Sequence, residues 1–224
     1  VTPKLMEYWK RYSPQLFVTA SHATQFNLEM PFGKGLIVSG NNRFYALDKK
    51  QFREFTTFLR GVLFNGKEDD LLSFLKRIKA PVIETRPVPA VWVAAGNCLI
   101  GDAKKTKNSM AVTALSRYGF NQLVGYTVPS WYGKGGWGTL GLLFSNHDAS
   151  SLAEAWYLNN QFILDETMIR FPKLMDVHFN SPDINGIKND PDFARGMNSA
   201  GYGMGKDQLG LIHDRDTVAF YGDP

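Results

Sequence analysis

The chain has 224 residues, of which 44% are hydrophobic and 13% aromatic, and its formal net charge is +4. This length and composition suit a single globular domain, residues 1–224, and exclude a disordered chain. The basic residues are scattered rather than clustered, so neither nucleic acid nor a membrane surface is indicated as a partner. One cysteine excludes an internal disulfide, and no apolar run reaches the roughly 18 residues of a membrane span.

The first predicted elements are a helix and a strand. Residues 3–12, PKLMEYWKRY, begin with proline and place their apolar residues on one face, which predicts a short amphipathic helix. Residues 14–23, PQLFVTASHA, contain an apolar strand that ends in His22. This strand has the form of a central one, so we expect neighbouring strands on both of its sides.

A loop, a hairpin and two helices are predicted next. Residues 23–35 are polar and rich in glycine, which indicates a loop. Residues 36–40 and 43–47 flank Asn41 and Asn42, a pattern typical of a β-hairpin. The two helices are residues 49–61, which Asp48 can cap, and a segment from Asp69 or Asp70 that ends before Pro81.

The only cysteine follows a second apolar strand. Residues 90–95, AVWVAA, are apolar without alternation, as in a strand buried on both faces of a parallel sheet, and a Gly-Asn pair breaks the run just before Cys98. A helix over residues 109–119, which Asn108 or Ser109 can cap, and a strand over residues 121–128 come next. This order is a βαβ unit, whose crossover is right-handed in nearly all known proteins.

The positions of His22 and Cys98 predict a common site. Each residue follows an apolar strand, and ligands gather at the carboxyl ends of strands in open α/β sheets. If the two strands are parallel neighbours, about 4.8 Å apart, imidazole and thiol lie at one rim and can act as base and nucleophile. A lone cysteine or histidine is more often structural, and the matched positions favour the catalytic interpretation.

Residues 129–138, PSWYGKGGWG, contain four glycines and three aromatic residues. Glycines let backbone approach a ligand closely and rings supply apolar area, so we interpret this segment as a pocket wall at the same sheet edge. The alternative is a loop whose tryptophans pack beneath it. Lys134 is its only cation and no acidic residue stands out as a selector, so the substrate residue before the cleaved bond is left unassigned.

The remainder is predicted to be one long helix, a loop-rich stretch and a last strand. The helix covers residues 149–169, and residues 216–224 alternate as a strand. Residues 171–210 are rich in Asn, Asp, Gly and Pro, which indicates long loops with short helices. Residues 145–210 are therefore expected to form a loop-rich insertion in the domain.

No metal or other cofactor is predicted. His147 with Asp148 and His213 with Asp214 are adjacent pairs without the spacing of metal ligands. We expect both pairs to lie in surface turns.

Two blocks resemble the caspase-like clan of cysteine peptidases, which includes caspases, legumains, clostripain and gingipains. LFVTASHA is similar to the strand that ends in the catalytic histidine, and VWVAAGNC to the strand that ends in the catalytic cysteine. The gingipain branch is the most similar, through AAGNCLIG, SMAVTALSRYG, NQLVGYTVPSW and VAFYGDP. The resemblance covers most of residues 14–140 and the C-terminal strand, but not residues 145–210.

The resemblance implies a three-layer α/β/α sandwich with a mostly parallel sheet, and an endopeptidase that uses a Cys/His dyad. Cys98 would attack the peptide carbonyl and His22 would handle the proton, while the backbone amides of Ala23 and Cys98 hold the oxyanion. A peptide or protein substrate would be bound by Thr127, Trp131, Tyr132 and Trp137. The resemblance also implies autoprocessing and a secreted or periplasmic bacterial location.

The chain departs from the family in two ways. Ala23 stands where the family has a glycine after the histidine, although an alanine amide can donate equally well. The two strands that precede the histidine strand in the family are missing, so the chain is expected to be part of a longer protein, or another chain of the same precursor completes the sheet.

Two other functions are consistent with these residues. One is a caspase-like binding or structural module without activity. The other is a glycan-binding surface, which would need the rings of Trp131, Tyr132 and Trp137 to be exposed and coplanar.

Overall fold

In the computed structural model, the described residues are 2–62, 68–85, 88–103, 108–145, 151–179 and 190–223. The first half contains α1 (Thr2–Tyr12), β1 (Leu16–Thr19), β2 (Ala23–Thr24), β3 (Asn27–Glu29), η1 (Pro31–Gly33), β4 (Gly35–Gly40), β5 (Arg43–Asp48), α2 (Lys49–Val62), α3 (Glu68–Arg77) and β6 (Ala90–Ala94). The second half contains α4 (Met110–Arg117), β7 (Phe120–Tyr126), α5 (Lys134–Ser145), α6 (Leu152–Arg170), η2 (Pro172–Asp176), α8 (Pro191–Ala200), α9 (Lys206–Thr217) and β8 (Val218–Gly222). None of the described helices has the length and apolarity that crossing a membrane requires.

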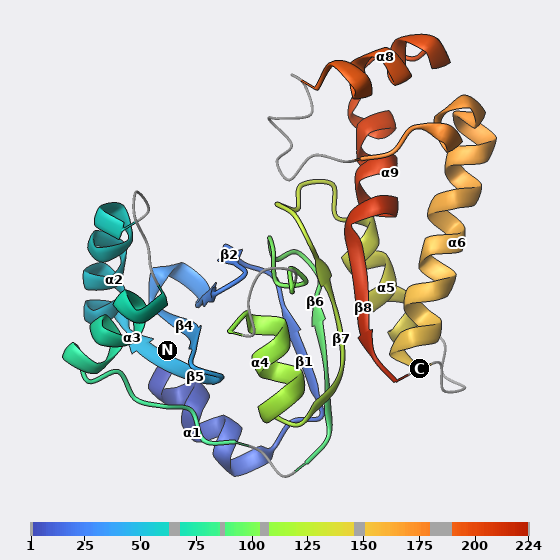
Figure 1. Cartoon of the computed structure of the whole chain (residues 1–224). Coiled ribbons are helices and arrows are strands. Elements are labelled where there is room, and N and C mark those ends of the chain that lie inside the picture. The colour runs from blue at the N-terminus through green and yellow to red at the C-terminus, as the bar shows by residue number, and fades with distance from the viewer. Residues whose placement is uncertain are drawn as a thin grey trace.

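The protein is a mixed α/β fold built on a mostly parallel four-stranded sheet of order β1-β6-β7-β8 (Figure 1). β1 runs parallel to β6, with Thr19 opposite Ala94, and β6 runs parallel to β7. β8 returns antiparallel to β7. The predicted pairing of the two apolar strands and the βαβ unit through α4 are therefore confirmed.

β1 lies at an edge of this sheet, so its predicted central place is wrong for the described residues. Val18 in β1 is exposed, whereas every described residue of β7 except Asn121 is buried. A continuous apolar run indicates that both faces of a strand are packed. It does not indicate whether a strand is paired at each of its two edges. Completion of the sheet by another chain remains a prediction.

Helices cover both faces of the central sheet, as in an α/β sandwich (Figure 1). On one face, α4 lies between the central sheet and a second, antiparallel sheet of order β2-β3-β4-β5. On the other face, Leu140 of α5 and Leu152 of α6 pack against Val93 and Val124. The helices α2 and α3 pack against the smaller sheet through Phe55 and other apolar residues.

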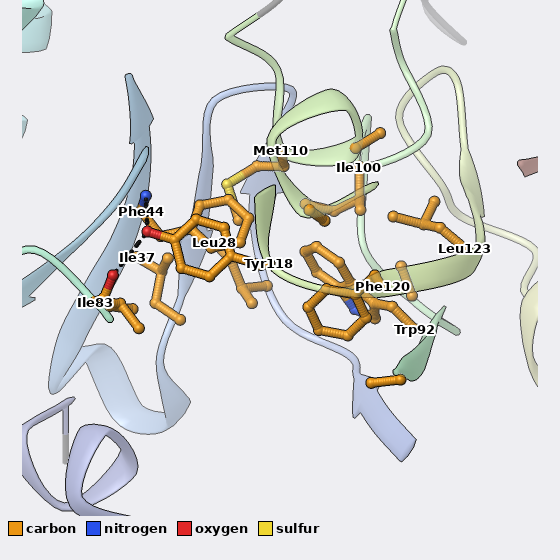
Figure 2. Close-up of a cluster of buried hydrophobic side chains, with 14 of the residues drawn as sticks. Leu28, Ile37, Phe44, Ile83, Trp92, Ile100, Met110, Tyr118, Phe120 and Leu123 are labelled. Atoms are coloured by element: carbon orange, nitrogen blue, oxygen red, sulfur yellow. Dashed lines mark hydrogen bonds between the residues drawn. The ribbon is translucent and has the colours of Figure 1, made fainter. Parts of the chain in front are cut away.

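The two sheets share one hydrophobic core (Figure 2). Tyr118, fully buried after α4, donates a hydrogen bond to the backbone oxygen of Ile83 at 2.8 Å and accepts one from the backbone nitrogen of Phe44, also at 2.8 Å. Trp92 of β6 and Phe120 of β7 pack with their rings 5.7 Å apart. This core ties the smaller sheet to the strand that precedes Cys98.

The predicted hairpin turn and helix caps, which depend on residues close together in the chain, are confirmed. Asn41 and Asn42 have φ of 48° and 53°, the left-handed values that a two-residue hairpin turn needs. The Asp48 carboxylate accepts from the backbone nitrogen of Gln51 at 2.9 Å, so it caps α2 as predicted. The Ser109 hydroxyl caps α4 in the same way.

Two predicted loops contain regular structure instead. Residues 23–35 form the hairpin of β2 and β3 followed by η1, and α5 begins at Lys134, inside the predicted pocket loop. The glycines of that segment allow close helix–strand packing: a Cβ on Gly136 would lie 2.1 Å from the Ala95 oxygen, and one on Gly135 2.4 Å from Val218. Their role in helix packing is not visible from composition alone.

Between residues 145 and 210 the described structure is largely helical. α6 is the predicted long helix, capped by Ser151, and η2 and α8 follow it. Leu174, Phe193 and Met197 pack with Ile212 of α9 in a separate apolar cluster. Residues 180–189 lie outside the described residues.

Candidate active site

His22 and Cys98 line one pocket of about 510 Å³. His22 follows β1 by three residues and Cys98 follows β6 by four, so both lie beyond the carboxyl ends of adjacent parallel strands. The His22 side chain is exposed and Cys98 is partly exposed. The other residues that line the pocket are Ala20, Ser21, Glu29, Met30, Pro31, Phe32, Gly96, Ser130 and Trp137.

Asn97, immediately before Cys98, joins the two loops that carry these side chains. It is fully buried, and its side-chain nitrogen donates to the Ser21 backbone oxygen at 2.8 Å and to the Ser21 hydroxyl at 3.2 Å. The Thr19 hydroxyl donates to the Asn97 side-chain oxygen at 2.5 Å. From the sequence alone, Asn97 was predicted only to end the apolar strand. An amide next to a candidate nucleophile was the signal available for this role.

Two further hydrogen bonds anchor this connection. The indole nitrogen of the buried Trp92 donates to the Thr19 hydroxyl at 2.8 Å. The Ser21 hydroxyl donates to the Glu29 backbone oxygen at 2.7 Å, which fixes the loop to the β2–β3 hairpin. The backbone around both candidate catalytic residues is therefore held by side chains that reach into the core.

The sulfur of Cys98 faces Ser130. Its Sγ lies 3.8 Å from the Ser130 backbone oxygen and 3.7 Å from the Ser130 hydroxyl, which donates to the Gly96 oxygen at 3.1 Å. Leu99, the next residue, has a left-handed φ of 59°, and its backbone nitrogen donates to Val128 at 3.2 Å. Within the described residues, no hydrogen bond joins the His22 ring to Sγ.

Ala23 opens β2 and pairs with Leu28, so the residue after His22 lies in the smaller sheet. The His22 backbone oxygen accepts from the Glu29 nitrogen at 2.9 Å, which holds this turn. Ala23 is not among the residues that line the pocket. The oxyanion role of its amide stays a prediction.

The four predicted substrate-binding residues are not brought together. Trp137 lines the pocket, and Tyr132 lines a neighbouring pocket that shares Trp137. Thr127 is bonded to the Thr217 oxygen through its backbone nitrogen at 2.8 Å and its hydroxyl at 3.1 Å. Trp131 packs against the cluster of η2, α8 and α9, and its buried indole nitrogen has no hydrogen-bond partner among the described residues.

The ring geometry does not meet the condition set for a glycan surface. The rings of Trp131 and Tyr132 are tilted by 59°, and both side chains are partly buried. Of the three aromatic residues in the segment, only Trp137 is exposed.

His213 and Asp214 are fully buried, so their predicted place in a surface turn is wrong. His213 Nδ1 lies 2.7 Å from an Asp214 carboxylate oxygen, and its Nε2 lies 3.1 Å from the Pro129 oxygen. The other carboxylate oxygen accepts from the Gly135 nitrogen at 2.8 Å and from the Tyr126 hydroxyl at 3.2 Å. A histidine and an aspartate on a helix can be buried when neighbouring groups provide hydrogen-bond partners for both side chains.

This pair supports the loop that carries Ser130. Burial, followed by the nearby Asp214 charge, raises the pKa of the Tyr126 phenol far above its ordinary value, so the phenol remains a hydrogen-bond donor.

The described residues contain no group of three or more His, Cys, Asp or Glu side chains that could hold a metal. His147 and Asp148 lie outside the described residues.

A series of ion pairs connects the segment of residues 129–138 to α6 and α9. Lys134 pairs with Glu166, whose other oxygen lies 2.6 Å from Arg170, and Arg170 lies 2.7 Å from Asp207. The Tyr132 hydroxyl donates to Asp207 at 3.1 Å. The hydrogen bond from Lys134, more than that from Arg170, lowers the pKa of Glu166, and burial together with Asp207 raises the pKa of Tyr132 to about 12.

Phe32, for which the sequence predicted no role, lies at the rim of the pocket. Its side chain is 90% exposed, and its φ of 62° is left-handed. The Lys34 amino group lies 5.6 Å from the centre of its ring. A bulky residue in this conformation is strained, and such strain is found at ligand-binding sites.

Comparison of the chain with protein-family models, curated proteins and solved structures finds no match. The likeness to caspase-like peptidases therefore depends on the sequence blocks quoted above.

Proposed function

We propose that this chain is a cysteine peptidase of caspase-like fold in which Cys98 is the nucleophile and His22 transfers the proton. The observation that carries the proposal is the presence of both side chains in one pocket beyond two adjacent parallel strands. The network through Asn97 adds support, because it fixes the backbone on both sides of that pocket. Preorganised positioning of this kind is what catalysis by two side chains requires.

The proposed reaction begins when His22 takes the proton of the Cys98 thiol and the sulfur attacks the peptide carbonyl carbon, which forms the C–S bond and moves charge to the carbonyl oxygen. Two backbone amides, those of Cys98 and Ala23, would stabilise this oxyanion, an effect worth about 3 kcal/mol per donor. The C–N bond then breaks as His22 gives a proton to the leaving amine. Water, deprotonated by His22, then attacks the thioester carbon; the C–S bond breaks, the sulfur recovers its proton from His22, and the acyl half leaves as a carboxylic acid.

A second candidate is a caspase-like module without peptidase activity. The specific observation in its favour is the environment of Sγ, which faces Ser130 and has no hydrogen bond to the His22 ring within the described residues. Catalytic hydrogen bonds are often long before substrate binds, and the reactivity of Cys98 in the presence and absence of His22 distinguishes the two functions.

Covalent labelling tests the proposal. The wild-type chain, Cys98→Ala and His22→Ala are each incubated with a peptidyl acyloxymethyl ketone, and intact mass is recorded over time. We expect one added probe for wild type, none for Cys98→Ala and a rate at least about a hundredfold lower for His22→Ala, the smallest effect typical of a lost acid–base group.

Alkylation of the unfolded wild-type and His22→Ala chains provides the control, because both retain one thiol. The same spectra report self-cleavage, which should occur in wild type and be absent from Cys98→Ala if the chain is autoprocessed. Equal labelling of wild type and His22→Ala would contradict the dyad and favour the inactive module.

A further inference from the structure

A second pocket adjoins the candidate catalytic pocket. It also measures about 510 Å³, and Trp137 lines both. Its other walls are Tyr132 and Lys134 before and at the start of α5, and Phe162, Ile163 and Glu166 on α6. The shared wall at Trp137 makes the second pocket a candidate site for another side chain of a peptide bound at Cys98.

The side chains around this pocket leave apolar area exposed to solvent. Phe162 is 58% exposed and Trp137 is 51% exposed, while Ile163, which also lines the pocket, is buried. Exposed aromatic rings gathered at a pocket supply the contact area from which binding energy is mostly drawn.

The charged groups of this pocket already have partners. Lys134 is paired with Glu166, and Glu166 is also paired with Arg170. The amide nitrogen of Asn159 is used by the backbone oxygens of Lys134 and Gly135, at 3.1 and 2.9 Å. A charged group of a ligand that enters this pocket would lose its hydration and find no unpaired opposite charge to replace it. An apolar group has no hydrogen bonds to water to lose, so it enters at a lower cost in free energy.

We infer that the pocket between α5 and α6 is a specificity subsite, which binds a bulky uncharged side chain of a peptide whose reacting carbonyl lies at Cys98. This inference rests on the proposed function and assigns the substrate class that the sequence left open. Leucine, methionine and phenylalanine have the required chemistry. The carboxylate of Glu29 belongs to the other pocket, and selection of arginine through it is the competing outcome.

The subsite is tested by binding, without turnover, in the Cys98→Ala chain. Fluorescent tetrapeptide amides that differ at one position, carrying phenylalanine, leucine, glycine, arginine or aspartate, are titrated and followed by anisotropy. We expect the phenylalanine and leucine peptides to bind at least about tenfold more tightly than the other three, a factor that corresponds to about 1.4 kcal/mol.

The variant Phe162→Ala, made in the same background, should remove most of that preference. Tyr157→Ala is the matched control, because Tyr157 is 55% exposed on the same helix and does not line the pocket. Phe162→Asp should in addition improve binding of the arginine peptide by placing a carboxylate without a partner in the pocket. Circular dichroism confirms that each variant is folded.

Preference for arginine or aspartate in the unmodified pocket, or a preference that survives Phe162→Ala, would overturn the inference. Peptide hydrolysis by the chain with Cys98 intact is measured separately. Apolar preference without hydrolysis would leave the subsite standing and refute the peptidase. Hydrolysis without apolar preference would support the peptidase and refute the subsite. Absence of both binding and hydrolysis would refute the subsite and the peptidase.

Discussion

The side-chain nitrogen of Asn97 lies 2.8 Å from the backbone oxygen of Ser21, so a single buried amide connects the residue before Cys98 to the residue before His22. Residues 76 positions apart in the chain are joined at this point. The distance between thiol and imidazole therefore depends on a hydrogen bond rather than only on the pairing of β1 with β6.

Asn97→Ala should reduce both stability and reactivity. The Ser21 oxygen and the Thr19 hydroxyl lose their partner, at a cost of about 1–3 kcal/mol in the free energy of unfolding. Because His22 and Cys98 are then held less well, labelling by the peptidyl probe should slow at least about tenfold, the effect expected when positioning of reacting groups is lost. The rate of probe labelling, recorded between pH 5 and pH 9, measures the loss of reactivity. Urea denaturation measures the loss of stability.

Asn27→Ala is the matched control for that variant. The side chain of Asn27 donates to the Thr24 hydroxyl at 2.8 Å, within the β2–β3 hairpin and away from Cys98. It should lose a comparable hydrogen bond without changing the labelling rate or its pH dependence. If both variants label equally slowly, the amide of Asn97 has no positioning role.

Phe32→Gly should stabilise the protein. The left-handed conformation costs a bulky residue about 1–2 kcal/mol, and glycine adds about 0.5–1 kcal/mol of unfolded-state entropy. The free energy of unfolding should rise by about 0.5–1 kcal/mol, since the exposed ring contributes little packing. Asn41→Gly is the control, also at positive φ, and should gain less because asparagine tolerates this conformation. A loss of stability in Phe32→Gly would show that the ring is held by contacts.

Asp214→Asn should destabilise the protein strongly. Its carboxylate accepts from His213, Gly135 and Tyr126 in a fully buried position, and an amide cannot accept from all three. Leaving a buried hydrogen-bonding group without its partner typically costs about 1–3 kcal/mol in the free energy of unfolding, which urea denaturation would detect. Asp176→Asn, at an exposed position, should change stability by less than about 0.5 kcal/mol. A similarly small effect for Asp214→Asn would contradict this role.

Glu166→Gln should make stability less dependent on pH in the acid range. The pKa of Glu166 is lower in the folded protein than in the unfolded chain, where it is about 4.3. Its contribution to the free energy of unfolding is therefore present above about pH 4.3 and lost as the pH falls through the lower folded value. Wild type should exceed the variant by about 1 kcal/mol at pH 7 and by almost nothing near pH 2.

Urea denaturation at pH 7, 4 and 2 measures this difference. Asp165→Asn is the control, on the same helix and without an ion pair to any described residue. A stability difference between wild type and Glu166→Gln that does not change with pH would show that the effect comes from packing instead of charge.

The sequence predicted the elements whose signals are local. The hairpin turn at Asn41 and Asn42, the caps at Asp48 and Ser109, and the apolar runs of β6 and β7 depend on residues close in the chain. The same is true of the placement of Cys98 just after a strand. The β2–β3 hairpin within residues 23–35 was predicted as a loop, because both strands are too short to show a pattern.

The candidate site could be predicted only in part. That His22 and Cys98 lie at one sheet edge follows from two apolar strands of similar form, because parallel neighbours end together. The presence of Phe32 and Glu29 in the same pocket, and of Trp131 in another cluster, could not be predicted. Those positions depend on how the β2–β3 hairpin and α9 pack.

By itself, the sequence determined most of the longer strands and helices and which reactive side chains follow β1 and β6, because turn chemistry, capping and periodicity act over a few residues. Only the tertiary structure decided that Asn97 bridges the two loops, that His213 and Asp214 are buried, and that Phe162 borders a pocket beside Trp137. Each of these facts depends on contacts between distant segments, where the burial of one side chain is set by the shape of another.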